Sequence, residues 1–144
     1  MNTEDVLSKA PLFAALDREG AAALRTSVTE VRLTKGQVLF REHESGDRLY
    51  VVLEGKIKLS RTAPDGRENL LSVLGPGEMF GELSLFDPRP RTASAIAITD
   101  ARLAGLGHDD LRPWLTGRPE VALGLLRALA QRLRRTNDVL ADLV

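Results

Sequence analysis

Residues 77–93 read GEMFGELSLFDPRPRTA and combine, over a short distance, the groups needed to hold a phosphate and a sugar hydroxyl. Gly81 allows the backbone to approach a ligand closely, and a turn beginning at Glu82 would point several amide N–H groups toward an anion. Arg91 adds a forked, charged donor to the same anion. A carboxylate repels phosphate, so the natural partner of Glu82 in this pocket is a hydroxyl donor such as a ribose. The stretch therefore predicts a nucleotide pocket.

Short strands separated by turn signals surround this stretch. After Ser27, apolar and charged residues alternate with a period of two, as in Val31-Arg32-Leu33. The clearest strand covers residues 56–60, and its expected hairpin partner covers residues 69–74. The turn signals are Lys35-Gly36, Ser45-Gly46-Asp47, Glu54-Gly55, Pro64-Asp65-Gly66 and Gly75-Pro76-Gly77. Such regular punctuation favours an all-β sandwich or barrel over a βαβ fold, here across residues 29–107.

Helices are expected on both sides of this β region. Residues 1–28 carry two short helical patterns, one over residues 3–15 and a second one capped by Asp17. Pro119 is expected to open the longest helix, because proline is tolerated at a first helical position. The predicted fold is mostly β: a double-stranded β-helix, or jelly-roll barrel, with short N-terminal helices and a long C-terminal helix over residues 119–144.

The C-terminal helix carries a heptad seam. Its members are Leu126, Leu129, Leu133, Thr136, Leu140 and Leu143. This spacing fits a coiled-coil dimer, although a single amphipathic helix lying on the barrel shows a similar stripe. Thr136 places a hydroxyl among the leucines, where a polar residue sets the register or contacts a ligand. The helix has no stop signal before Val144, so more protein is expected to follow.

Composition excludes several classes of protein. The chain has 144 residues, which suits one domain, and no cysteine, which rules out disulfides, thiolate-held zinc and thiol nucleophiles. Lysine and arginine balance aspartate and glutamate at 20 each, so no strong attraction to nucleic acid is implied. Apolar runs such as residues 49–53 are far shorter than the ~20 residues of a membrane span. The N-terminus does not resemble a secretory signal, and a cytoplasmic protein is expected.

The sequence predicts neither a metal site nor a catalytic site. His43 and His108 are its 2 histidines, and they lie in separate predicted turns without the paired spacing of a metal-binding barrel enzyme. We expect surface or helix-capping roles for both. A small barrel enzyme of the cupin type is the alternative, and stoichiometric metal in the purified protein would favour it.

Three motifs together resemble a known family: Gly81-Glu82-Leu83-Ser84, Arg91-Thr92-Ala93, and Thr136-Asn137 in a long helix. The chain resembles the cyclic-nucleotide-binding domain of the Crp/Fnr family of bacterial transcription regulators, with the cAMP receptor proteins as its nearest branch. The resemblance covers essentially the whole chain. It implies that Glu82 accepts the ribose 2′-hydroxyl, that Arg91 pairs with the cyclic phosphate, and that Thr92 and the amides after Gly81 complete the phosphate cradle. For an arbitrary glutamate and arginine, a simple ion pair at a loop would be the alternative.

The resemblance also implies which residues surround the base. Leu59, Leu71 and Ser72 would line the wall near it. Thr136 would reach the adenine from the dimer helix, with Asn137 of the partner subunit beside it, and Arg132 is a further candidate on that helix. Thr92 and Asn137 stand where the best-known members have serine, so the selectivity for the base and the ligand conformation are open.

The function implied is that of a sensor rather than an enzyme. cAMP, or a related cyclic nucleotide, would be the effector, and a homodimer through the C-terminal helix would pass its occupancy to a helix-turn-helix domain beyond residue 144. That domain would bind DNA, and RNA polymerase would be a further partner. The alternative is a dimerisation module with a different nucleotide or none. Haem sensing, known for relatives of this fold, is disfavoured by the phosphate motif.

Overall fold

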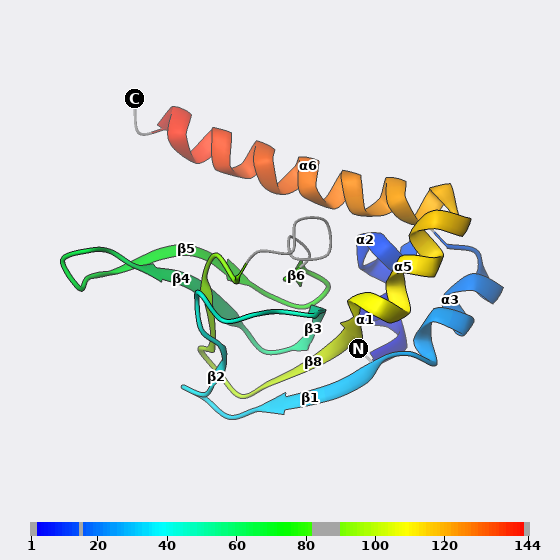
Figure 1. Cartoon of the computed structure of the whole chain (residues 1–144), viewed down its shortest axis with the longest axis horizontal. Helices are drawn as coiled ribbons and strands as arrows, with labels where there is room; N and C mark the ends of the chain where they lie inside the picture. The colour runs from blue at the N-terminus through cyan, green and yellow to red at the C-terminus, as the bar shows by residue number, and fades with distance from the viewer. Residues whose placement is uncertain (1–2, 15, 82–89, 143–144) are drawn as a thin grey trace.

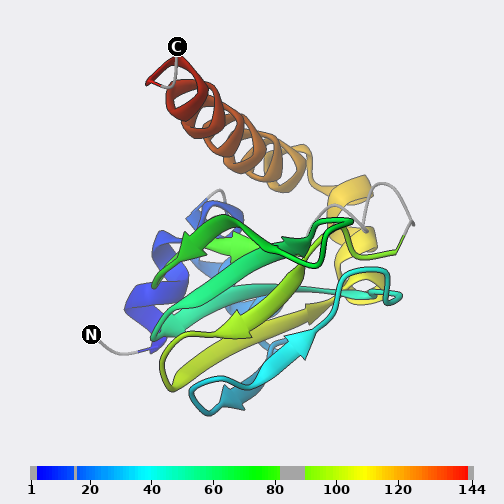
Figure 2. The same cartoon turned by 90° about the vertical axis from the view of Figure 1, so that its left-hand side faces the viewer.

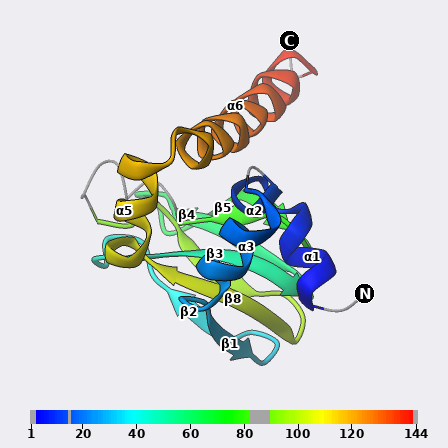
Figure 3. The same cartoon turned by 90° about the vertical axis from the view of Figure 1, so that its right-hand side faces the viewer.

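The computed structural model describes the backbone of residues 3–14, 16–81 and 90–142, and the side chains in these ranges except 3, 4, 11 and 136–142. Two sheets face each other, the N-terminal helices cover one of them, and a long helix crosses above both (Figures 1 and 3). In chain order the described elements are α1 (Thr3–Lys9), α2 (Pro11–Ala14), α3 (Arg18–Arg25), β1 (Thr29–Leu33), β2 (Val38–Phe40), β3 (Arg48–Glu54), β4 (Ile57–Thr62), β5 (Glu68–Leu74), β6 (Met79–Phe80), β7 (Ser94–Ala97), β8 (Ala101–Gly107), α5 (His108–Gly117) and α6 (Pro119–Asp142).

The sheets are antiparallel and confirm the predicted jelly-roll class. One sheet has the strand order β1-β8-β3-β6 and the other has the order β2-β7-β4-β5. Strands that are far apart in sequence pair in both sheets, as β1 does with β8 and β4 with β7. Among the described residues the sheets remain two facing layers, so the predicted barrel is not closed.

Strand β3 explains how the two sheets and the helices share one core. Its side chains are buried on both faces, which is why its sequence is a continuous apolar run rather than an alternating one. Leu49 and Val51 pack with the helices, whereas Tyr50 and Val52 pack between the sheets. The alternation of side chains along a strand therefore divides the core into two layers that meet at β3.

The N-terminal region departs from its prediction in one place. The helical pattern over residues 3–15 is divided into α1 and α2, because Pro11 lacks the backbone N–H that would continue α1. The predicted cap on α3 is confirmed, since Asp17 Oδ1 accepts from the Gly20 N–H at 2.7 Å. Helix α6 begins at Pro119 as predicted and packs on α2 and α5.

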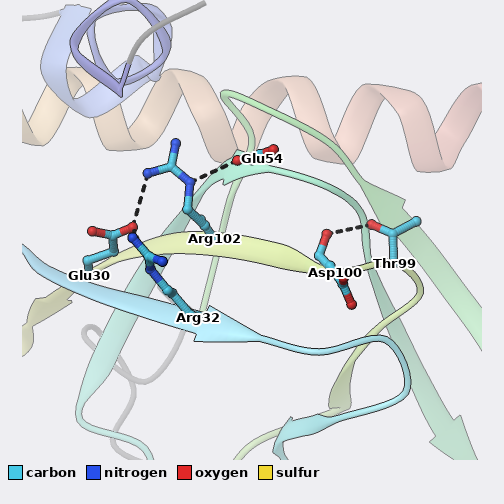
Figure 4. Close-up of polar contacts among 6 residues, drawn as sticks. All are labelled: Glu30, Arg32, Glu54, Thr99, Asp100 and Arg102. Carbon is cyan, nitrogen blue, oxygen red and sulfur yellow. Dashed lines mark hydrogen bonds and ion pairs between the residues drawn. The ribbon is translucent and has the colours of Figure 1, made fainter.

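Three neighbouring strands are joined by a surface ion network (Figure 4). Arg102 of β8 donates to Glu54 of β3 at 2.8 Å and to Glu30 of β1 at 3.0 Å. The hydrogen bond from Arg102 is the main reason why the pKa of Glu30 lies below its ordinary value, and Arg32 acts in the same direction. A carboxylate with a lowered pKa stabilises the fold above its ordinary pKa, and this contribution is lost as the pH falls through the lowered value.

Arg102→Gln is accordingly expected to lower the melting temperature by only about 1–3 °C near neutral pH, because exposed ion pairs contribute little. The difference from wild type should narrow in acid, as the pH falls through the lowered pKa of Glu30 and that carboxylate is protonated. Thermal denaturation followed by circular dichroism at neutral and at acid pH measures this, and a difference that stays undiminished in acid would contradict the ionic explanation.

Within the described part of the chain, no helix combines the length and the apolar character that crossing a bilayer requires.

Candidate functional site

The site is built around Arg91, whose side chain is buried although it carries a full charge. Only 7% of the residue is exposed. Its Nη1 donates to the Gly81 carbonyl at 3.1 Å, and its Nη2 donates to the Arg48 carbonyl at 2.8 Å. The guanidinium also lies 4.2 Å from the centre of the Phe40 ring. Two carbonyl groups and an aromatic ring therefore hold this buried cation from several sides.

Two glycines make room for this guanidinium. Gly81 adopts a φ of +83°, and a Cβ built there would lie 2.8 Å from Arg91 Nη1 and 3.0 Å from the Arg48 carbonyl oxygen. A Cβ built on Gly46 would overlap the guanidinium itself. Gly81 was predicted from its motif, but Gly46 was interpreted only as a turn residue. Its role depends on a contact with Arg91 across 45 positions of sequence, which no local pattern reveals.

The backbone of Arg91 is fixed as firmly as its side chain. The Arg91 N–H donates to the Glu44 carbonyl at 2.7 Å, and the Arg91 carbonyl accepts from the His43 N–H at 2.8 Å. His43 itself has a φ of +75°, a conformation that a non-glycine residue adopts only where its surroundings impose it. The loop over residues 41–47 therefore pairs through backbone hydrogen bonds with the segment that carries Arg91. This pairing fixes the position of the Arg91 backbone.

An aromatic cluster lies beneath the guanidinium. Phe40, Tyr50 and Phe80 form three contacting rings, with centroids separated by 5.4–6.2 Å. Burial raises the pKa of Tyr50, while the charge of Arg91 acts in the opposite direction. This apolar floor excludes water from one side of the Arg91 guanidinium, and so strengthens its electrostatic interactions with any anion placed on the other side.

The phosphate motif is only partly within the described residues. Glu82, Leu83 and Ser84 lie outside them. Beside Arg91, Thr92 is exposed and Ala93 is buried, so the two residues face opposite ways. The structure thus brings Gly81 and Arg91 together, and these are two of the residues predicted for the anion-binding part of the pocket.

The predicted base wall is brought together by strand pairing. Leu59 of β4 lies opposite Ser72 of β5 and opposite Ala95 of β7, so the three residues share one face of the sheet. Leu59 packs against the core between the sheets, which places this face inward. The pairing of β4 with β5 shifts directly after Leu59, and Leu71 lies at this irregularity with 54% of its surface exposed.

Helix α6 approaches the pocket at β6. Arg132 is half-buried and donates to the Met79 carbonyl, and Arg135 pairs with Glu78 at 3.1 Å. Arg132 therefore contacts the strand that leads into Gly81. Thr136 and Asn137 continue α6, but their side chains lie outside the described set.

A cavity of about 540 Å³ lies between α6 and the turn before β6, and it does not include Arg91. Its lining consists of Lys9, Pro76, Gly77, Glu78, Met79, Ala128, Gln131, Arg132, Arg134 and Arg135. Volume alone does not identify the binding site, because a second cavity of about 590 Å³ lies among the N-terminal helices. The buried charge and the close-fitting glycines lie instead at Arg91, so we assign the candidate site there. No cluster of metal-ligating side chains occurs among residues 3–14, 16–81 and 90–142.

One predicted role is wrong. His108 was expected at the surface or as a helix cap, but it is buried with 3% exposure, and α5 has no side-chain cap at Gly107. Sequence reasoning failed here because His108 begins a helix directly after β8, and only the packing of that junction buries it. His43 is exposed, as expected.

The chain belongs to the cyclic nucleotide-binding domain family, which matches residues 30–116. The predicted resemblance to the sensor domain of Crp/Fnr regulators is thereby confirmed. The chain is 50% identical over 141 residues to a CRP-like cAMP-activated global transcriptional regulator of Mycobacterium tuberculosis, covering 98% of this chain and 63% of that protein.

Solved structures show the same relationship. The N-terminal domain of a transcriptional regulator from Streptomyces coelicolor A3(2) is 63% identical, with a TM-score of 0.75 and coverage of 94% of this chain and 95% of that one. The Thermus thermophilus catabolite activator protein is 37% identical with a TM-score of 0.81, covering 93% of this chain and 63% of that one. These relatives are regulators rather than enzymes, in agreement with the predicted absence of catalysis. The chain spans just under two thirds of the full-length relatives.

Proposed function

We propose that this chain binds cAMP, or a closely related cyclic nucleotide, with the phosphate held at Arg91. The buried guanidinium of Arg91 is the observation that carries the proposal. Its hydrogen-bond partners at Gly81 and Arg48 are neutral carbonyls, and an anionic phosphate oxygen accepts a stronger, charge-assisted hydrogen bond than a carbonyl does. In this proposal the fold already holds the Arg91 side chain in place, so binding costs little further ordering of that side chain.

The remaining roles follow the family pattern on this framework. In the proposed complex Glu82 accepts the ribose hydroxyl, while Thr92 and the amides of Leu83 and Ser84 complete the phosphate cradle beside Ala93. Leu59, Leu71 and Ser72 face the base from the sheet. Thr136 and Asn137 reach the base from α6. The contact of Arg132 with Met79 supports a role in tying α6 to the phosphate motif, in place of direct contact with the base.

We further propose that the chain works as a homodimer through α6. Two of the three described seam leucines are well exposed, Leu126 at 60% and Leu133 at 61%, and Leu129 is half-buried. Val121 and Leu125 form the buried face of the helix instead. Figure 2 shows α6 rising away from the sheets toward the C-terminus, which leaves this apolar seam available to a second copy.

Replacing both Leu126 and Leu133 with glutamate is expected to weaken the dimer at least a hundredfold, because each dimer would lose four buried leucines and gain four clustered carboxylates. Sedimentation velocity over a range of concentrations measures the effect. Arg127→Glu is the matched control, since residue 127 is exposed on the same helix and lies outside the seam. A double variant that dimerises as wild type does would exclude the seam as the interface.

In the complete cytoplasmic regulator, the dimer would carry DNA-binding domains beyond residue 144. Two observations support this extension: the chain spans 63% of its M. tuberculosis relative, and that relative is named as a transcriptional regulator. Nucleotide binding would then bias the orientation of the two α6 helices, provided that the ligand binds one orientation more tightly than the other.

A melting-temperature panel tests the nucleotide assignment. At a hundredfold excess over its dissociation constant, a ligand stabilises the native state by about 2.7 kcal/mol, so cAMP should raise the melting temperature by about 5–10 °C. Equal concentrations of cGMP and 5′-AMP serve as comparisons. If cAMP leaves the melting temperature unchanged and another nucleotide raises it clearly, that nucleotide replaces cAMP as the proposed ligand. If no nucleotide changes the melting temperature, the chain is better described as a dimerisation module without a nucleotide ligand.

A further inference from the structure

His108 occupies a position behind the proposed phosphate site that the family assignment does not explain. It is the first residue of α5, and 3% of it is exposed. Its backbone N–H donates to the Asp47 carbonyl at 2.7 Å, so the loop that supplies Gly46 to the Arg91 pocket also fixes the start of α5. The backbone of His108 is thus held by the same loop that makes space for the guanidinium.

The imidazole and the guanidinium meet at one backbone group. The His108 side chain hydrogen-bonds to the backbone of Gly81, whose carbonyl also accepts from Arg91 Nη1 at 3.1 Å. Within the described part of the chain, His108 Nε2 is buried and has no hydrogen-bond partner. Gly81 directly precedes Glu82, so His108 contacts the first residue of the predicted phosphate motif.

The surroundings favour the neutral form of this imidazole in the ligand-free protein, because they lower its pKa. Burial is the largest cause that lowers the pKa of His108, and the charges of Arg91 and, more weakly, Arg112 of α5 act in the same direction. The Gly81 backbone and Asp47 of the loop before β3 oppose them. Arg91 is the nearest of these influences that a ligand would change, because a bound phosphate offsets its positive charge.

We infer that His108 is a positioning residue of the phosphate site, and that binding of a cyclic phosphate at Arg91 is coupled to uptake of a proton by its imidazole. The inference rests on the proposed function and adds a residue and a pH dependence to it. The proton comes from the solvent. Protonation makes both ring nitrogens donors, strengthens the hold on the Gly81 backbone, and places a second positive charge behind the phosphate.

The direction of the pH effect follows from linkage. A phosphate that raises the pKa of His108 binds more tightly to the protonated form, so affinity for cAMP rises as the pH falls from neutral through the pKa of His108 in the complex. Each unit by which the ligand raises this pKa allows at most a tenfold gain in affinity. The cyclic phosphodiester keeps its single negative charge throughout this range, so the ligand contributes no titration of its own.

Calorimetric titration of the whole chain with cAMP tests the coupling. Titrations at about pH 6 and pH 8, each in two buffers of different ionisation enthalpy, measure both the affinity and the protons taken up. Wild type is expected to bind several-fold more tightly at about pH 6 than at about pH 8, with net uptake of protons on binding. His108→Gln should bind without proton uptake and with affinity independent of pH. His43→Asn is the control, because it removes the other histidine while suiting the positive φ at that position.

The outcomes separate the two proposals. Tight binding of cAMP by wild type without proton uptake overturns the role of His108 and leaves the nucleotide assignment intact. Absence of binding at either pH overturns the proposed function itself. If His108→Gln does not fold, NMR titration of the His108 ring proton in wild type decides, since its pKa must rise when cAMP is added, and an unchanged pKa contradicts the inference.

Discussion

Arg91→Gln is expected to lower affinity for cAMP by about a hundredfold, the largest loss of any single replacement in this chain. The variant removes the only charged donor that the described residues supply at the phosphate position, and a charge-assisted hydrogen bond from a buried group is worth about 1.5–3 kcal/mol. Arg91→Lys should lose about tenfold, because an ammonium keeps the charge but not the fork. Calorimetry at low ionic strength measures both.

Arg91 also supports the fold, so its variants need a stability control. The side chain satisfies the Gly81 and Arg48 carbonyls, and its loss is expected to lower the melting temperature of the ligand-free protein as well. Titrations must therefore be made well below the melting temperature of each variant. Arg61→Gln is a matched control, since Arg61 lies on β4 with a side chain that is 57% exposed. Retention of full affinity in a folded Arg91→Gln would remove Arg91 from the site.

Gly46→Ala is expected to reduce cAMP affinity at least tenfold without changing any group that touches the ligand. The added methyl group would overlap the Arg91 guanidinium and force it away from the Gly81 and Arg48 carbonyls. Overpacking of this kind costs about 1–3 kcal/mol, so the melting temperature should fall too. The same calorimetric titration measures the loss of affinity.

Gly75→Ala provides the comparison for Gly46→Ala. No atom lies within 4 Å of a Cβ built on Gly75, and neither glycine has a positive φ that would penalise alanine by itself. We therefore expect wild-type affinity and stability in Gly75→Ala. If the two alanine variants behave alike, the close fit around Arg91 is not what positions the guanidinium.

Local periodicity and turn chemistry predicted most of the fold. The alternation around Ile57 and Leu59 marks β4, and Pro64-Asp65-Gly66 marks the hairpin to β5. These signals act between neighbouring residues, which is why sequence alone reveals them. The division of the first helix at Pro11 is also predictable from the sequence, because proline removes one backbone hydrogen bond. The prediction missed it because the apolar pattern continues on both sides of Pro11.

The candidate site was harder to predict because it depends on contacts between distant segments. Gly81 and Arg91 were found from one short motif. Gly46, Phe40 and His108 were not, since each reaches Arg91 or Gly81 only through the packing of separate strands and loops. A glycine in a turn and a histidine at a helix start are each compatible with many roles. The roles of Gly46 and His108 become apparent only from their positions relative to the buried Arg91 guanidinium.

A crystal structure of the chain with cAMP is the most direct test of the central claim, that Arg91 is the phosphate anchor of a nucleotide site. We predict a phosphate oxygen about 2.7–2.9 Å from a guanidinium nitrogen of Arg91, with the base beside Leu59 and Ser72. A nucleotide bound instead in the groove between α6 and β6, with no phosphate oxygen near the Arg91 guanidinium, would contradict the account.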